Sequence, residues 1–249
     1  MTFAVVVPMF NEQKTIEATL EALRTQTLPA FKVVLCDNAS TDLTMDVVQA
    51  FILQHALPWS VITETRKGTG AASDTAVRAA ILDGATVVAR TDADCVPAAD
   101  WAETLVRRFE SGQVDLIAGW TKPRRDENLS ALQYVLLIFL TELAMVFGRV
   151  RPSNRGPQFM GPYLMTQGNN VAFTSALYER VGGFTRTAIE EGHEDRALIL
   201  AVRQVTDRYE FRRDVVVRAS ARRLQAWGVK RSLTWYAGHL FNAENVDIR

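Results

Sequence analysis

The chain has 249 residues, 28 Lys and Arg against 28 Asp and Glu, and a hydrophobic fraction of 48%, so its formal net charge is zero. This composition excludes an intrinsically disordered chain, which has few apolar residues and a large net charge. It also argues against a nucleic-acid partner, because proteins that neutralise phosphates usually carry a basic excess. The length suits one large α/β domain or two smaller ones.

The chain contains two cysteines, Cys36 and Cys95, which end apolar runs. They lack the spacing of a zinc site or a disulfide framework, so we expect a reducing, cytoplasmic setting. The N-terminal apolar run over residues 3–7 follows no basic residues and is too short for a signal peptide or a membrane span. We expect it to form the first β-strand.

The first half of the sequence alternates β-branched runs with helical patterns, which is typical of a mostly parallel sheet covered by helices. The predicted strands are Phe3–Val7, Phe31–Asp37, Ser60–Thr63 and Thr86–Thr91. Apolar residues three and four positions apart predict crossover helices over Thr15–Leu23, Thr44–Leu53 and Ala71–Leu82. Because open α/β sheets bind ligands outside the carboxyl ends of their strands, we expect the functional site at that edge.

The pattern changes after about Trp120, where charged residues lead into a long apolar segment. No internal repeat, low-complexity tract or long linker separates the two parts. We therefore predict a single domain over residues 1–249, with a regular first half over 1–119 and an elaborated second half over 120–249.

Two carboxylates, Asp92 and Asp94, follow the fourth predicted strand. Carboxylate oxygens suit Mg²⁺ or Mn²⁺, which typically bind through one or two carboxylates together with the phosphates of a substrate. An ordinary acidic turn is the alternative, and an isolated Asp-x-Asp does not decide between the two. The surrounding loops favour the metal-diphosphate interpretation.

Polar loops also follow the first three predicted strands. Residues 8–12 read Pro-Met-Phe-Asn-Glu, and Asp37 begins the run Asp-Asn-Ala-Ser-Thr-Asp. Asp37 could accept a hydrogen bond from an imide or a ribose hydroxyl, whereas Ser40 or Thr41 could simply cap the next helix. Residues 66–70, Arg-Lys-Gly-Thr-Gly, could hold an anion at a helix N-terminus, although they lack the spacing of a P-loop or a dinucleotide fingerprint.

Together these motifs resemble the family 2 glycosyltransferases with the GT-A fold. The matching segments, in the family's order, are Pro8–Glu12, Asp37–Asp42, Thr91–Asp94, Gly168–Phe173, Val181–Phe184 and Glu194-Asp195. The resemblance covers roughly residues 3 to 200. It implies an α/β fold of GT-A type, with a mostly parallel central sheet flanked by helices. It also implies a Rossmann-like half over 1–119 that binds the nucleotide sugar, and an acceptor-binding, catalytic half over 120–249.

The resemblance implies a nucleotide diphosphate sugar as donor, with a UDP-sugar favoured, and Mn²⁺ or Mg²⁺ as cofactor. The residues that it places around the nucleotide are Pro8, Phe10, Glu12, Asp37, Asn38 and Lys67. It places Asp94 on the metal, and Asp92 near the ribose and the metal.

On the acceptor side, the resemblance implies that Asp195 is the general base. Its carboxylate would take the proton of the acceptor hydroxyl during an attack that inverts the anomeric configuration. The residues expected to contact the acceptor are Gly168, Asn169, Asn170 and Glu194. A purely structural alternative for Glu194 and Asp195 is favourable charge at a helix N-terminus, which is compatible with catalysis.

The chain departs from the family pattern at two places. It has Ser73-Asp74 where many members have Arg-Asn, which puts in doubt a nucleotide contact from that helix. The Gln-x-x-Arg-Trp of processive members is absent, so a non-processive enzyme is expected. Arg222 and Arg223 follow the last predicted strand, where a guanidinium could bind the diphosphate; a solvated basic face is the alternative.

Several alternatives stay open at this point. His193 or His239 could supply a third metal ligand, although a hydrogen-bonded or solvent-facing imidazole is the favoured interpretation of each. A sugar nucleotidyltransferase would use a similar fold and metal, but the glycine-rich opening of such enzymes is missing. A nucleotide-sugar-binding protein without turnover is disfavoured by the intact pair Glu194-Asp195.

The apolar segment Ala131–Phe147 is just short of the roughly 20 residues that a membrane span needs, and Glu142 within it would be costly in a bilayer. We first expect a helix buried in the core or in a homodimer interface. Our second expectation is a helix that lies in the membrane surface and meets a lipid-linked acceptor there. Cations on both sides favour the second interpretation slightly, so the protein is expected to be cytoplasmic or peripheral at the inner face of the membrane.

Overall fold

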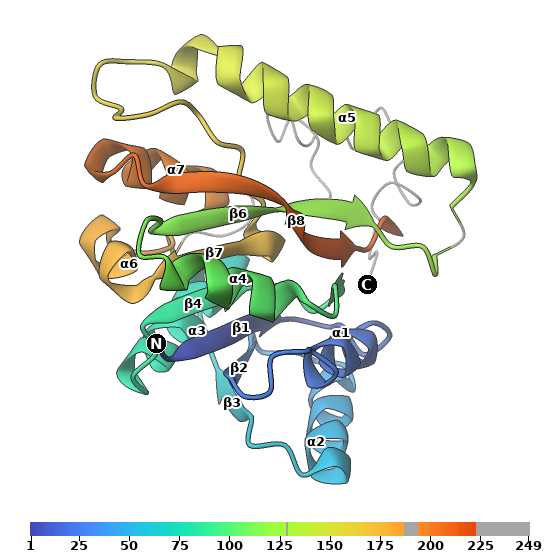
Figure 1. The fold of residues 1–249 in the computed structure, drawn as a ribbon. Helices are drawn as coiled ribbons and strands as arrows, with labels where there is room; N and C mark the ends of the chain where they lie inside the picture. The colour runs from blue at the N-terminus through green and yellow to red at the C-terminus, as the bar shows by residue number, and fades with distance from the viewer. Residues whose placement is uncertain (128, 187–193, 223–249) are drawn as a thin grey trace.

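The computed structural model describes residues 1–127, 129–186 and 194–222. Its strands are β1 (Phe3–Met9), β2 (Lys32–Asp37), β3 (Ser60–Thr63), β4 (Val87–Arg90), β5 (Cys95–Pro97), β6 (Leu116–Pro123), β7 (Val171–Thr174) and β8 (Tyr209–Ala219). They form one eight-stranded sheet in the order β3-β2-β1-β4-β7-β6-β8-β5 (Figure 1).

The helices are α1 (Ile16–Arg24), α2 (Thr44–His55), α3 (Thr69–Leu82), α4 (Trp101–Glu110), α5 (Ala131–Val150), α6 (Ser175–Val181) and α7 (Glu194–Val205), with 3-10 turns η1 (Pro152–Asn154) and η2 (Gly168–Asn170). The four strands and three helices predicted in the first half are confirmed, and their ends shift by at most two residues. The periodicity of apolar residues was therefore sufficient to predict these seven elements, whereas β5, α4 and the start of β6 in the same half were not predicted.

The sheet is parallel on one side and mixed on the other. β1 pairs in parallel with β2 and β4, and β2 pairs in parallel with β3, so the carboxyl ends of these strands meet at one edge. β7 runs antiparallel between β4 and β6, β8 is parallel to β6, and β5 is antiparallel to β8. The predicted boundary between the two halves falls inside β6, where the pairing with β8 shifts register between Gly119 and Trp120.

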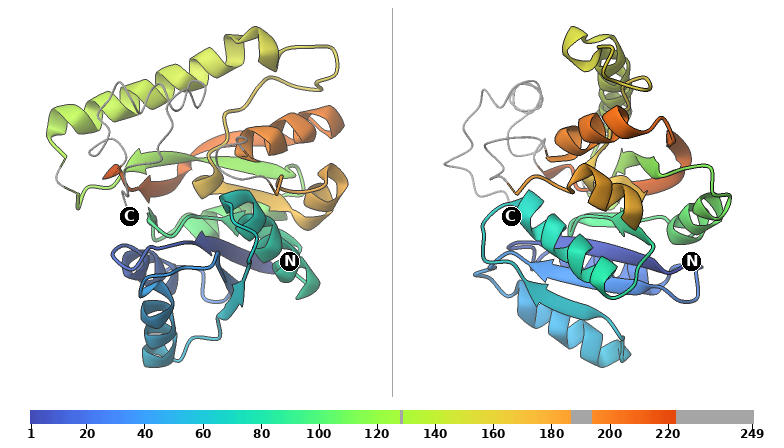
Figure 2. Two further views of the ribbon diagram at one scale, coloured as in Figure 1. Left: turned by 180° about the vertical axis from the view of Figure 1, so that it is seen from behind. Right: turned by 90° about the vertical axis from the view of Figure 1, so that its left-hand side faces the viewer.

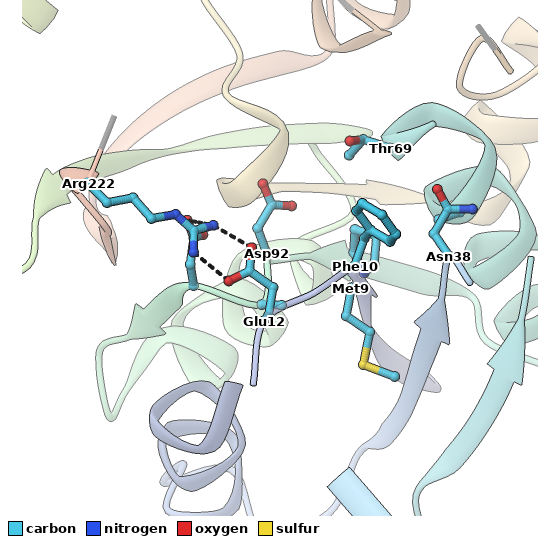
Figure 3. Close-up of a pocket in the computed structure, with 11 residues that line it drawn as sticks. Met9, Phe10, Glu12, Asn38, Thr69, Asp92 and Arg222 are labelled. Atoms are coloured by element: carbon cyan, nitrogen blue, oxygen red, sulfur yellow. Dashed lines mark hydrogen bonds and ion pairs between the residues drawn. The ribbon is translucent and has the colours of Figure 1, made fainter. Parts of the chain in front are cut away.

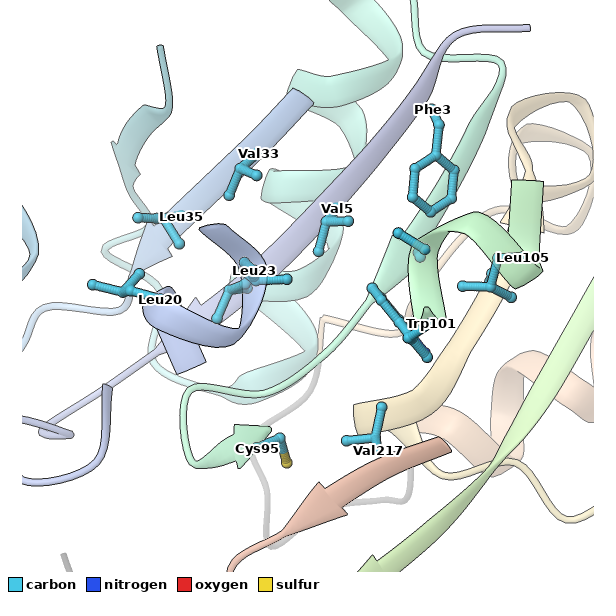
Figure 4. Close-up of a cluster of buried hydrophobic side chains, with 14 of the residues drawn as sticks. Phe3, Val5, Leu20, Leu23, Val33, Leu35, Cys95, Trp101, Leu105 and Val217 are labelled. Carbon is cyan, nitrogen blue, oxygen red and sulfur yellow. The ribbon is translucent and has the colours of Figure 1, made fainter. Parts of the chain in front are cut away.

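Each face of the sheet is covered by its own set of helices (Figure 2). Alternate residues of β1 point to opposite faces, so Phe3, Val5 and Val7 join one core and Ala4 and Val6 the other. The first core includes side chains of α1, α2 and α4 (Figure 4), and the second includes side chains of α3, α6 and α7. Both faces are therefore occupied before α5 is considered.

Helix α5 has clear start and stop signals. The Ser130 hydroxyl accepts from the Gln133 backbone amide at 3.2 Å, and the Gln133 side chain accepts from the Ser130 amide at 2.9 Å. This capping box satisfies two backbone donors at the helix start. The helix ends two residues before Pro152, which cannot continue an α-helix. At 20 residues and a mean hydropathy of 1.9, it is long and apolar enough to cross a membrane by those two measures alone, so the shorter predicted segment underestimated it.

The prediction that this segment is buried in the core of the chain is wrong. Only Met145 and Gly148 are buried in α5. The helix lies along one end of the molecule, beyond β6 and β8, and the helical side chains of both cores come from other helices (Figure 1). The contacts that hold it there include the close approach of Gly148 to the Tyr163 ring, where an added Cβ would lie 2.7 Å away, and a 2.7 Å ion pair between Glu142 and Arg213 of β8.

Candidate active site

The loops that follow β1 and β2 are hydrogen-bonded to each other. The Ser40 hydroxyl accepts from the Asn11 backbone amide at 3.0 Å, and the Thr44 hydroxyl accepts from the Glu12 amide at 2.7 Å. The Asn11 side chain accepts from the Thr41 amide at 2.8 Å, and Asn11 itself has a left-handed backbone with φ of 52°. Ser40 and Thr41 therefore join the two loops and do not cap α2, which has no side-chain cap.

Asp37 and Asn38, at the end of β2, organise the loops around them. Asp37 is only 5% exposed, and its carboxylate accepts from the backbone amide three residues on. The Asn38 amide donates to the carbonyls of Glu64 and Arg66 at 2.8 and 2.9 Å, and its oxygen accepts from the Gly68 amide at 2.8 Å. Asn38 thereby shapes the loop that carries Lys67.

A pocket opens at this edge of the sheet (Figure 3). It is lined by Pro8, Met9, Phe10, Glu12, Asn38, Thr69, Ala72, Asp92, Ala93, Asp94 and Arg222. Seven of these are residues that the sequence predicted for the donor site or the metal. Of the other predicted residues, Asp37 is buried outside the lining, and the Lys67 ammonium lies 5.6 Å from the centre of the Phe10 ring.

Arg222 crosses this pocket from the segment after β8 (Figure 3). Its guanidinium makes two hydrogen bonds to the Glu12 carboxylate, one of them 2.6 Å long from Nη1 to Oε2, and lies 3.0 Å from Asp94 Oδ2. A single cation therefore neutralises two carboxylates that come from distant parts of the chain. Arg223, the other predicted diphosphate ligand, lies outside the described residues.

The two carboxylates of the Asp-x-Asp motif lie in a turn, in which the Cys95 backbone amide donates to the Asp92 carbonyl at 3.1 Å. Burial raises the pKa of Asp94, the charges of Glu12 and Asp92 raise it further, and Arg222 opposes both effects. Within the described part of the chain, no three His, Cys, Asp or Glu side chains are grouped to hold a metal ion. His193 and His239, the candidate third ligands, lie outside the described residues.

Arg90 is a site residue that our sequence analysis missed. At the end of β4 it is 1% exposed, and it donates to Asp92 at 3.1 Å and to Glu194 at 3.2 Å. Its guanidinium also lies 5.2 Å from the centre of the Phe184 ring. A Cβ on Gly168 would approach this guanidinium to 2.8 Å, so only glycine fits beside it without a shift. The sequence did contain a signal for it: residues 87–90, Val-Val-Ala-Arg, end an apolar strand with a cation.

Asp195 lies in the first turn of α7, next to Glu194, which accepts a hydrogen bond from Arg90. Burial raises its pKa to about 6, and the charge of the adjacent Glu194 contributes in the same direction. The Arg196 backbone amide, which donates to Asp195 Oδ1 at 2.7 Å, lowers the pKa, as do Arg90 and the amide of Gly168. A carboxylate with a pKa near 6 is suited to proton transfer at neutral pH, because it is ionised yet more basic than an ordinary aspartate.

Residues 4–164 match the family described as Glycosyl transferase family 2, which is more than half of the chain. The chain belongs to this family. Its α/β fold is of the GT-A type that we predicted. AglE from Haloferax volcanii is 29% identical over 118 residues, which are 47% of this chain and 38% of AglE.

Solved structures of glycosyltransferases superpose on nearly the whole chain. The mannosyltransferase PcManGT from Pyrobaculum calidifontis, in complex with GDP-Man and Mn²⁺, has a TM-score of 0.67 at 25% identity, over 95% of this chain and 62% of that chain. TarS 1-349 from S. aureus, in complex with UDP-GlcNAc, has a TM-score of 0.64 at 19% identity, over 88% of this chain and 58% of that chain. At 19% identity, the likeness to TarS shows a shared fold only.

The residues predicted for the acceptor side divide into partly exposed and buried ones. Asn170 is 1% exposed; its side chain accepts from the Trp101 indole at 3.0 Å and donates to the Val215 carbonyl at 3.1 Å. Because both ends of its amide are bonded inside the protein, Asn170 stabilises the η2 turn, and this arrangement does not favour contact with an acceptor. Asn169 is partly exposed and accepts from the Thr121 hydroxyl at 3.1 Å.

Asp74, where the chain departs from the family pattern, has a structural role. It is 1% exposed, and its carboxylate accepts from Arg78, Tyr178 and Arg186 at 2.9 to 3.0 Å. Arg186 also bonds to Glu64, whose carbonyl accepts from Asn38. Asp74 therefore connects the donor-side loops to the chain that leads towards α7, and it does not line the pocket.

Proposed function

We propose that this protein is a non-processive, metal-dependent glycosyltransferase that moves a sugar from a nucleotide diphosphate to an acceptor hydroxyl with inversion. Two arginines carry the proposal: one lies inside the donor pocket, and the other joins a pocket carboxylate to the residue beside the proposed base. Arg222 contacts Glu12 and Asp94 in the pocket, whereas Arg90 contacts Asp92 on one side and Glu194, next to Asp195, on the other. Asp92, which lines the pocket, and Glu194, which precedes the proposed base, thus share one buried cation.

The donor set of the pocket fits a divalent cation. Asp92 and Asp94 both line the pocket, and two carboxylates together with diphosphate oxygens are the ligands that Mg²⁺ or Mn²⁺ prefers. Asp94, with its raised pKa and two neighbouring acids, is a position where added positive charge is favourable. When bound, the cation would neutralise charge that develops on the leaving diphosphate.

The chain's own residues supply the remaining chemistry. Asp195 would accept the proton of the acceptor hydroxyl while that oxygen forms a bond to the anomeric carbon, and the bond to the diphosphate oxygen would break with its electron pair on the diphosphate. Arg222 is placed to bind the diphosphate through the two donors that now contact Glu12. Arg90 would keep Glu194 and Asp92 paired throughout, because it is fully buried.

The nucleotide base is the least constrained part of the proposal. The family resemblance favours a UDP-sugar, the PcManGT structure contains GDP-Man, and the TarS structure contains UDP-GlcNAc. Since the chain covers only 58–62% of those chains, contacts made elsewhere in them do not transfer. We propose a UDP-sugar as donor and keep GDP as the first competitor to test.

Calorimetry with UDP and GDP, each with and without Mn²⁺, tests the donor and metal assignment. We expect Mn²⁺ to strengthen nucleotide binding in the wild type, and Asp94→Ala to remove that gain. Asp46→Ala, which changes an exposed carboxylate on α2, is the matched control and should leave binding unchanged. Binding that does not depend on the metal, or unchanged affinity in Asp94→Ala, contradicts the assignment.

A further inference from the structure

Helix α5 lies at the edge of the molecule (Figures 1 and 2), and its outward face is apolar. Its large side chains are between 39% and 78% exposed: Leu132, Val135, Leu136, Phe139, Leu143, Val146, Phe147 and Val150. Between residues 131 and 147, no exposed position carries a charge. Contiguous exposed apolar surface of this kind marks an interaction site.

The C-terminal end of this surface is basic. Arg149, Arg151 and Arg155 are all exposed, and the sequence from Leu143 to Tyr178 contains no Asp or Glu. The apolar face is therefore followed by three cations with no acid nearby in the chain. This charge distribution complements an anionic surface that has an apolar layer beneath it.

We propose that α5 and residues 149–155 dock on the surface of an anionic lipid bilayer, with the helix lying in the plane of the interface. The apolar side chains would enter the boundary between headgroups and acyl chains, and the arginines would contact anionic headgroups. The Gly148–Tyr163 contact and the Glu142–Arg213 ion pair keep the helix along the domain, which favours lying on the bilayer over crossing it.

A second copy of the chain is a poorer fit to this face. Leu132, Leu136, Phe139, Leu143, Val146 and Val150 follow one another at spacings of four and three, as a helix pair requires. However, the positions beside that seam, which usually carry charges in paired helices, include the exposed side chains of Val135 and Phe147. The apolar face is wider than one partner helix would cover, whereas a bilayer covers all of it.

The basic end of α5 is fixed beside the proposed base. Asn154, just after the helix, is 2% exposed, and its amide donates to the Gly148 carbonyl at 2.8 Å. Its oxygen accepts from the Arg196 guanidinium at 2.8 Å, and Arg196 directly follows Asp195. Docking would therefore place Asp195 near the headgroup layer, where it would meet an acceptor hydroxyl carried by a lipid. This last step rests on the proposed function, whereas membrane docking does not.

Co-sedimentation with vesicles tests the docking. We expect the full chain to sediment with vesicles of phosphatidylcholine and phosphatidylglycerol, but not with phosphatidylcholine alone, and added salt to weaken the binding. Phe139→Asp should lower the bound fraction at least about tenfold, because it puts a charge in the apolar face. Replacing Arg149 and Arg151 by Gln should weaken binding roughly fivefold for each cation lost.

Leu82→Asp, at an 89% exposed leucine of α3, is the matched control and should bind vesicles like the wild type. An unchanged unfolding midpoint and unchanged nucleotide affinity would show that Phe139→Asp still folds, and Val135→Asp provides a second variant. Absence of sedimentation, or equal loss in Phe139→Asp and Leu82→Asp, overturns the proposal. A dimer in sedimentation velocity that Phe139→Asp dissociates, without vesicle binding, would assign the face to a second copy instead. If the proposed function is wrong, the nucleotide calorimetry described above will show no metal-dependent binding, whatever the vesicle experiment shows.

Discussion

The donor edge of the sheet and helix α5 differ in how many of their side chains are bonded to, or buried against, other parts of the chain. At the donor edge, Asn11 and Asn38 each bond to several groups of a neighbouring loop, and Asp37 is buried. Helix α5 buries two residues and leaves eight large apolar side chains exposed. The donor edge is stabilised from within, whereas the outer face of α5 has its stabilising partner, in our proposal, outside the chain.

The difference has a consequence for catalysis. Because the loops of the pocket are bonded to each other, we expect a nucleotide to bind with little movement of the backbone, which lowers the entropic cost of binding. Arg222, however, would have to exchange Glu12 for the diphosphate. The proposed base, Asp195, is instead followed by Arg196, which bonds to Asn154 at the end of α5. If the proposals hold, substitutions should affect donor binding without acceptor delivery, or the reverse.

The largest expected effect is on turnover in Asp195→Asn. Loss of the general base should lower kcat by about 10²- to 10⁴-fold, while the donor edge keeps its nucleotide affinity. Initial rates and calorimetry on the same preparation measure both quantities. Asp207→Asn, an exposed acid just beyond α7, should behave like the wild type. Near-normal turnover in Asp195→Asn would place the base elsewhere.

Arg90→Met should be the most destabilising of the single changes. It leaves Asp92 and Glu194 without their buried counter-charge, and breaking such a pair costs about 3–5 kcal/mol. Denaturant unfolding measures the loss. Arg107→Met, which removes an exposed pair with Glu103, should cost about 1 kcal/mol or less. If the two variants lose equal stability, Arg90 does not connect the two halves of the site energetically.

The same substitution in the two regions gives a direct comparison. Leu20→Ala removes a fully buried side chain of α1 and should cost about 2–5 kcal/mol. Leu132→Ala, at a 78% exposed position of α5, should cost less than about 0.5 kcal/mol in the absence of lipid. Thermal unfolding of both variants measures the contrast. A large cost for Leu132→Ala in dilute solution would mean that another part of the protein covers the outer face of α5.

Much of the donor edge was predictable, because its residues are encoded by short motifs at the ends of periodic strands. Asp92, Asp94 and Glu12 line the pocket as expected. Arg90 was missed because one of its partners, Glu194, is 104 residues away, and local pattern does not encode that distance. The burial of α5 was mispredicted for a related reason: the apolar character of a segment does not show which helices cover the sheet, and here other helices supply the side chains of both cores.

The smallest of these effects concerns the pH dependence of stability. Asp195 has a pKa of about 6 in the folded protein against an ordinary value of 3.8, so the folded state binds the proton more tightly than the unfolded state. Stability therefore falls as pH rises between about 4 and 6, and the cost is complete above that range. Asp195→Asn has no such ionisation and should be more stable than the wild type at about pH 7.5, by on the order of 1–3 kcal/mol, with the difference vanishing below about pH 4. Unfolding midpoints across this range measure the difference, with Asp207→Asn as the control. A variant less stable than the wild type at about pH 7.5 would show that the attraction of Arg90 outweighs the burial of Asp195, and that the donor edge and the base stabilise each other in the ionised state.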